Sequence, residues 1–168
     1  MPRIWKVSHS DIDTDDHSIL IENNLLAIGC LNRFEKGNTT IRDRFLAIDE
    51  GDYFYLVKSG NIILLGQVGN KIIPPLIVKN NHVSKNNRDI QLSSGIEGWL
   101  CREINIIKKV IYPNENVNCA DKVRQLGYMP SGQTLVFEVP DNALSEFESD
   151  LLKPVFDFNL EDLKISTL

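Results

Sequence analysis

The chain has 168 residues, a mass of 19.1 kDa and a formal net charge of −5, with 42% hydrophobic and 24% charged residues. This composition excludes a wholly disordered chain, and no apolar run approaches the roughly 20 residues of a membrane-spanning helix. The N-terminus has no apolar signal-peptide core, so we expect a cytoplasmic protein, and the acidic balance means that any phosphate-binding surface must be a local patch.

Apolar periodicity and turn residues predict alternating strands and short helices along the chain. The clearest unit is a hairpin of two strands joined by Ser59-Gly60-Asn61, a tight polar connection. The polar stretch 69–98 is expected to be mostly loop. In chain order we expect strands at 3–8, 25–30, 53–58, 62–68, 76–78, 99–110 and 134–139. We expect an acidic loop that runs into a short helix within 11–22, and helices at 42–48, 118–126 and after Pro140.

This order of elements predicts an α+β fold, a mixed sheet of five or six strands centred on the hairpin, with small helices around it. We expect a single domain over 1–153. The residues after it, 154–168, are expected to form a C-terminal tail or the start of a linker.

One acidic stretch follows the spacing of a calcium-binding loop, with Asp11, Asp13, Asp15 and Glu22 at the ligand positions. The glycine that such a loop needs at its sixth position is replaced by Asp16, so a solvated loop that begins a helix is the alternative.

Signatures of an enzyme are missing from the sequence. It contains no GxSxG, HExxH or GxxxxGK[ST] motif, and its three cysteines, Cys30, Cys101 and Cys119, are far apart and predict reduced thiols. We therefore predict a protein without catalytic residues, bound metal or cofactor.

Basic residues gather locally after the second strand and in the 69–98 stretch, with Asn and Ser between them. Such clusters suit phosphate contacts, although exposed loops are often rich in Lys and Asn. Trp5 and Trp99 offer rings for stacking against a base, and the alternative is that both are core residues.

Three blocks together resemble the PUA-like superfamily, and within it the EVE and YTH domains. They are the first strand RIWKVSHS leading to LAIGC, the hairpin GDYFYLVKSGNIILLGQV, and the late strand GWLCREINI. The resemblance covers roughly residues 3 to 110. It implies a small mixed β-barrel with short helices around it.

The resemblance also implies a nucleic-acid-binding specificity module that recognises a modified base, for example a methylated one, in a pocket, as the targeting part of a modification-dependent restriction or defence system. The implied ligand is then nucleic acid, with DNA favoured over RNA. The implied protein partner is a nucleotide-driven motor or a nuclease, and no membrane is involved. Reading duplex DNA would require base flipping. The alternative is a protein-interaction or assembly domain on the same fold.

The implied ligand surface lies where the first and second strands end. Asn32 suits a base edge because its amide both donates and accepts, although Asn is also a common turn residue. The implied base pocket comprises Trp5, Ser8, His9, Cys30, Leu31, Asn32 and Trp99, and the implied phosphate contacts are Arg33, Lys36, Lys85 and Arg88. The family's cage aromatics have no counterpart at Gly29, Cys30 or within 71–98, so Trp5, Phe34 or Trp99 would have to replace them, or the pocket reads another base.

Overall fold

The computed structural model describes residues 2–28, 40–70, 76–93, 98–110 and 135–165. In these ranges the strands are β1 (Ile4–Ser8), β2 (Leu25–Ile28), β3 (Tyr53–Lys58), β4 (Asn61–Val68), β5 (Leu76–Ile77), β6 (His82–Lys85), β7 (Arg88–Gln91), β8 (Leu100–Lys109) and β9 (Val136–Glu138). The helical segments are α1 (Thr14–Glu22), α3 (Thr40–Ala47), η1 (Asp141–Ala143), α5 (Leu144–Phe147), η2 (Glu148–Phe156) and η3 (Glu161–Leu163).

The main sheet is mixed and follows the order β2-β8-β4-β3-β1-β9, with β5 also paired to β8. Only the β1–β3 pair is parallel among the strand pairs of the described residues. The β3–β4 hairpin lies in the middle, as predicted, and Ser59 and Gly60 turn it with positive φ at both residues. The α+β class and the central hairpin are therefore confirmed.

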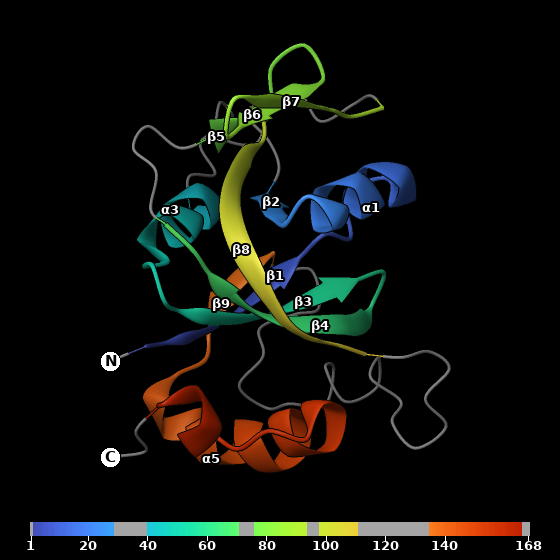
Figure 1. Cartoon of the computed structure of the whole chain (residues 1–168). Coiled ribbons are helices and arrows are strands. Elements are labelled where there is room, and N and C mark those ends of the chain that lie inside the picture. The colour runs from blue at the N-terminus through green and yellow to red at the C-terminus, as the bar shows by residue number, and fades with distance from the viewer. Residues whose placement is uncertain (1, 29–39, 71–75, 94–97, 111–134, 166–168) are drawn as a thin grey trace.

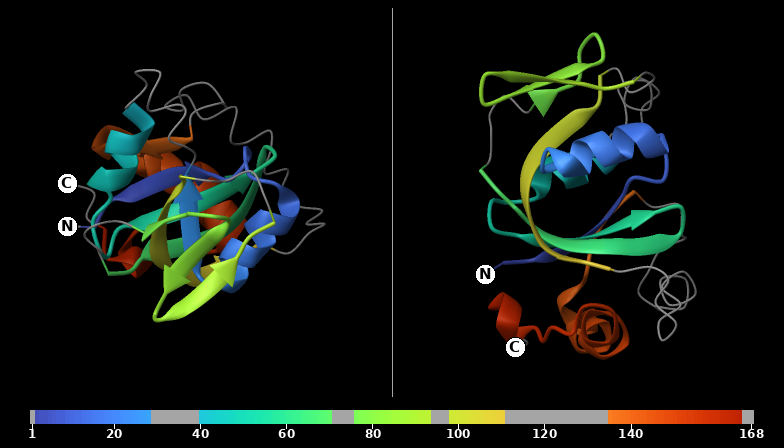
Figure 2. Two further views of the ribbon diagram at one scale, coloured as in Figure 1. Left: turned by 90° about the horizontal axis from the view of Figure 1, so that it is seen from above. Right: turned by 45° about the vertical axis from the view of Figure 1, so that its right-hand side comes forward.

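Strand β3 is buried on both faces because the sheet has core on each side. Tyr53 and Tyr55 point toward the C-terminal helices, whereas Phe54 and Leu56 point toward α3. Figures 1 and 2 show α1 and α3 on one side of the β3–β4 ribbon and the C-terminal helices on the other. Successive side chains of a strand point to opposite faces, so this near-continuous apolar run fits a central strand.

The long strand β8 gives the sheet its curvature. It pairs with β4 along one part of its length and with β2 and β5 along another, so the sheet curls into an open half-barrel (Figure 1). The register of β4 against β8 shifts between Leu65 and Gly66. Gly66 is needed there, because a Cβ at this position would lie 2.5 Å from Cζ of Phe54.

The stretch 69–98 is more structured than predicted. Beside β5, it contains the β6–β7 hairpin, which lies at the top of Figure 1. Two Asn-Asn pairs make its turns: Asn80-Asn81 precedes β6 and Asn86-Asn87 joins β6 to β7, all four with φ between 52° and 60°. Asn tolerates the left-handed conformation that such turns require, so these pairs were a missed hairpin signal.

The expected tail after residue 153 is wrong. Helix η2 runs through Pro154 to Phe156, and Phe156, Leu160 and Leu163 are at most 2% exposed in the core under β3 and β4. The apolar side chains of this segment lie on irregular helical turns. Their spacing in the sequence therefore did not match the α-helical period from which a buried face is predicted. The helix predicted at 118–126 lies outside the described residues.

Candidate functional site

A pair of histidines joins the end of β1 to β2 and α1. His9 is fully buried, and its Nε2 accepts a hydrogen bond from the backbone N–H of Ala27 in β2 at 3.1 Å. Its Nδ1 lies 2.9 Å from Nδ1 of His17 on α1, and the two rings meet edge to face. Beside them, the hydroxyl of Ser8 donates to Oγ of Ser10 at 2.8 Å. The structure thus brings the predicted residue His9 next to β2, whereas Ser8 pairs with strand β3.

The hydrogen bonds determine which nitrogen of each ring carries its proton. Because Ala27 donates to Nε2 of His9, neutral His9 holds its proton on Nδ1 and donates it to His17. Burial, together with the charges of His17 and Lys58, lowers the pKa of His9 well below its usual value. Burial and the charge of Lys58 lower the pKa of His17 to about 4. Both rings are therefore neutral at pH 7.

The two tryptophans expected to wall the base pocket lie in separate parts of the core. Trp5 is 3% exposed and packs with Phe45 against α3. Trp99 is 6% exposed and packs with Leu20 and Cys101. The structure therefore places both rings as core residues and does not bring them together into a cage.

The two predicted phosphate contacts that the structure describes lie together at the C-terminal end of α1. Nζ of Lys85 donates to the backbone oxygen of Asn23 at 2.7 Å, and Nη2 of Arg88 donates to Oδ1 of Asn23 at 3.2 Å. At the other end of the helix, Nζ of Lys58 donates to the backbone oxygen of Ile12. Three cations from distant parts of the sequence therefore surround α1.

The remaining predicted contacts, Cys30, Leu31, Asn32, Arg33 and Lys36, lie outside the described residues.

The calcium alternative is wrong. Thr14–Glu22 is helical, so the acidic stretch does not wrap around an ion. Asp16 points inward and accepts hydrogen bonds from the backbone N–H and the hydroxyl of Ser93. Within the described ranges, no group of three or more His, Cys, Asp or Glu side chains is placed to hold a metal.

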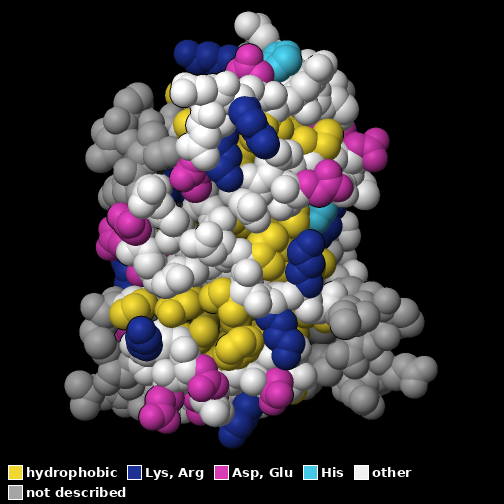
Figure 3. Space-filling view, in the orientation of Figure 1, with side chains coloured by type: hydrophobic (Ala, Val, Ile, Leu, Met, Phe, Trp, Pro, Cys, Tyr) yellow, Lys and Arg dark blue, Asp and Glu magenta, His cyan; other side chains and the backbone are white. Residues whose placement is uncertain are grey.

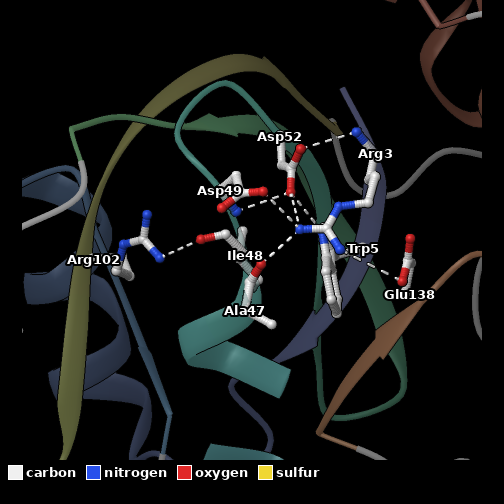
Figure 4. Close-up of polar contacts among 8 residues, drawn as sticks. All are labelled: Arg3, Trp5, Ala47, Ile48, Asp49, Asp52, Arg102 and Glu138. Atoms are coloured by element: carbon white, nitrogen blue, oxygen red, sulfur yellow. Dashed lines mark hydrogen bonds and ion pairs between the residues drawn. The ribbon is translucent and has the colours of Figure 1, made fainter. Parts of the chain in front are cut away.

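A polar network at the start of β1 was not predicted from the sequence (Figure 4). Buried Asp52 accepts hydrogen bonds from the backbone N–H of Arg3, from Nε1 of Trp5 and from the backbone N–H of Asp49, at 2.9 to 3.0 Å. The Arg3 guanidinium lies over the Trp5 ring, 4.9 Å from its centroid. Apart from Trp5, the partners of the Arg3 guanidinium are 44 or more positions away, so no local motif marks them.

Two members of this network, Arg3 and Trp5, line a cavity of about 770 Å³ between α3 and the segment of β9 and η1. Glu138 on β9 enters it, with Oε2 3.8 Å from Nη1 of Arg3. Burial, with the charges of Asp141 and Asp52, raises the pKa of Glu138, against the opposing effect of Arg3. The cavity is lined by Arg3, Trp5, Asp43, Arg44, Ala47, Phe137, Glu138, Pro140 and Asp141.

Two cationic side chains are buried without full hydrogen bonding within the described part of the chain. Arg102 on β8 donates from Nη1 to the backbone oxygen of Ile48 at 2.7 Å, while its Nε and Nη2 have no partner (Figure 4). Lys6 on β1 is fully buried, its Nζ has no partner, and burial lowers its pKa. Cys101, predicted to be an inward strand residue, is 1% exposed, and burial raises its pKa to about 12.

No family model matches this sequence, and no curated protein matches it. Among solved structures, the fold is similar to a hypothetical protein from Leishmania major, with a TM-score of 0.48 and 10% sequence identity over 83% of this chain and 88% of that chain. In the part of the chain that the structure describes, no helix is long and apolar enough to cross a membrane.

Proposed function

We propose that this protein binds nucleic acid as a non-enzymatic specificity module, with its ligand surface where β1 and β2 meet α1. The observation that carries the proposal is the gathering of Lys58, Lys85 and Arg88 around α1 in a chain of net charge −5. Exposed Asp15 and Glu22 lie on the same helix, so the three cations suit individual phosphate contacts rather than a uniformly basic surface. Figure 3 shows Lys and Arg side chains along this face of the molecule, with Asp and Glu side chains between them.

The open half-barrel with the hairpin at its centre supports the finer part of the proposal, a PUA-like domain of the EVE or YTH type. The same resemblance makes the ligand DNA that carries a modified base, and the biological role the targeting part of a modification-dependent restriction system. A motor or nuclease would then act on the DNA that this module selects.

Neutral donors and acceptors lie beside the cations. The exposed Ser10 hydroxyl and the second nitrogen of His17 provide uncharged hydrogen-bonding groups, which suit a base edge, whereas the buried Ser8 hydroxyl is already paired with Ser10. Lys85 and Arg88 would hold the phosphates and set the register. A base in a duplex would have to leave the stack, at a cost of about a few kcal/mol that pocket contacts must offset.

The test is fluorescence anisotropy with labelled single- and double-stranded oligonucleotides, methylated and unmethylated, over a range of salt concentrations. The logarithm of the binding constant should fall linearly with the logarithm of the salt concentration, because phosphate contacts release counterions. The double variant Lys85→Ala/Arg88→Ala should flatten this slope by about 2. The matched control is Lys153→Ala/Lys164→Ala, which removes two exposed cations from the C-terminal helices and should leave the slope unchanged.

Base reading is tested separately with Asn32→Ala, which should reduce discrimination between bases by about 1–3 kcal/mol. If the wild-type protein binds none of the oligonucleotides at low salt, the proposal is refuted, and the protein-interaction alternative takes its place.

A further inference from the structure

The cavity between α3 and β9 lies at the opposite end of β1 from Ser8 and His9, and the proposed function makes no use of it. Its volume of about 770 Å³ is within the range of small-molecule sites, roughly 300–1,000 Å³. Ala47, Phe137 and Pro140 give it apolar walls, and Arg3 and Glu138 bring one donor group and one acceptor group to the same place.

Arg3 is held rigidly with part of its hydrogen-bonding capacity unused. Nη2 alone contacts the backbone oxygen of Ala47 at 2.6 Å and the carboxylates of Asp49 and Asp52 at 3.1 and 3.3 Å. With the guanidinium also stacked on Trp5, its plane is fixed (Figure 4). Both two-nitrogen edges of a guanidinium include Nη2, so the group left to donate to a ligand in the cavity is Nη1.

Glu138 faces Nη1 of Arg3 without forming a hydrogen bond to it. The separation of 3.8 Å between its Oε2 and Nη1 of Arg3 is too long for a hydrogen bond. The raised pKa of Glu138 agrees with a carboxylate that lacks a close donor. A ligand that carries an acceptor beside an N–H donor would bond both side chains, and it would bring no new charge into the cavity.

We propose that this cavity binds the guanine base of a free nucleoside. Guanine offers O6 to Nη1 of Arg3 and, next to it, N1–H and N2–H to the two oxygens of a carboxylate, so Arg3 and Glu138 would both gain a partner. Adenine has an amino group where guanine has O6, and this donor would face the donors of Arg3. The apolar walls suit a flat ring.

The charges around the cavity make it a site for a nucleoside rather than a nucleotide. Asp43, Glu138 and Asp141 line it, whereas Arg3 is already compensated by two carboxylates and Arg44 donates to the backbone oxygen of Val136. A phosphate group would therefore be repelled. We expect guanosine to bind more tightly than GMP.

The experiment is isothermal titration calorimetry of the wild-type protein with guanosine, adenosine and GMP. Guanosine should bind at least about 10-fold more tightly than adenosine, since a bidentate pair discriminates by this order. Glu138→Gln should weaken guanosine binding by about 10-fold. Glu161→Gln is the matched control: it makes the same change at an exposed carboxylate on η3 that does not line the cavity, so guanosine affinity should change by less than about 2-fold.

Three results would overturn the proposal: no guanosine binding by the wild-type protein, equal affinity for guanosine and adenosine, or equal losses in the two variants. The first two need no variant, so a folding defect cannot obscure them. Because the cavity is separate from the cations around α1, Glu138→Gln should leave oligonucleotide binding unchanged. Either proposal can therefore fail without the other.

Discussion

Replacing Asp52 tests the buried network at the start of β1. Its carboxylate is 4% exposed and accepts hydrogen bonds from three N–H groups, one of them Nε1 of the buried Trp5. Asp52→Ala leaves these donors unpaired and removes the partner of the Arg3 guanidinium. Loss of one partner from such a buried charged network costs about 3–5 kcal/mol, because the remaining groups stay desolvated.

Urea denaturation followed by circular dichroism measures this loss. With a slope of about 2 kcal/mol/M, the midpoint should fall by roughly 1.5–2.5 M without a change in slope. Asp52→Asn retains one acceptor oxygen but turns an NH₂ group toward the donors. Its free energy of unfolding should therefore lie between that of the wild type and that of Asp52→Ala. Exposed Asp43→Asn is the control and should stay within about 0.5 kcal/mol. A loss below about 1 kcal/mol for Asp52→Ala would show that the carboxylate does not hold this network together.

Three further substitutions or conditions test other parts of the fold. Gly66→Ala should destabilise the protein by about 1–3 kcal/mol in urea denaturation, because its Cβ would overlap an aromatic ring; a neutral effect would contradict the β3–β4 packing. The lowered pKa values of His9 and His17 mean that the unfolded chain takes up protons below about pH 6.5 while the folded chain does not. The free energy of unfolding should therefore be highest above that pH and should decrease as the pH falls toward 4. His9 should contribute up to about 1.4 kcal/mol per pH unit to this decrease, and partly exposed His17 should contribute less. Thermal melts over this pH range measure the loss. His82→Gln, on the exposed hairpin, should leave this acid sensitivity unchanged, and a flat profile in the wild type would refute it. Arg102→Met should leave the protein equally stable or up to about 2 kcal/mol more stable, because it removes a buried charge with two unpaired donors; a large loss would show that this charge is compensated.

Local sequence signals were sufficient for the elements whose formation depends on near neighbours. The Ser59-Gly60 turn and the alternating faces of 53–58 predicted the central hairpin, because turn conformation and side-chain alternation are properties of a few adjacent residues. The Asn80-Asn81 and Asn86-Asn87 turns carried the same kind of signal, so the β6–β7 hairpin was predictable in principle.

The contacts that shape both candidate sites were decided only by the tertiary structure. His9 was singled out by its place after the first strand, but its hydrogen bond to Ala27 depends on how β1 and β2 lie in the sheet. Asp52 and Arg3 stand 49 positions apart, and Glu138 reaches Arg3 from the other end of the chain. A carboxylate in the sequence shows no sign of whether it will be exposed or enclosed, because its burial depends on which strands pair and which helix covers them. The guanine site and the junction of β1 with α1 therefore follow from the order of the sheet, β2-β8-β4-β3-β1-β9, rather than from any motif.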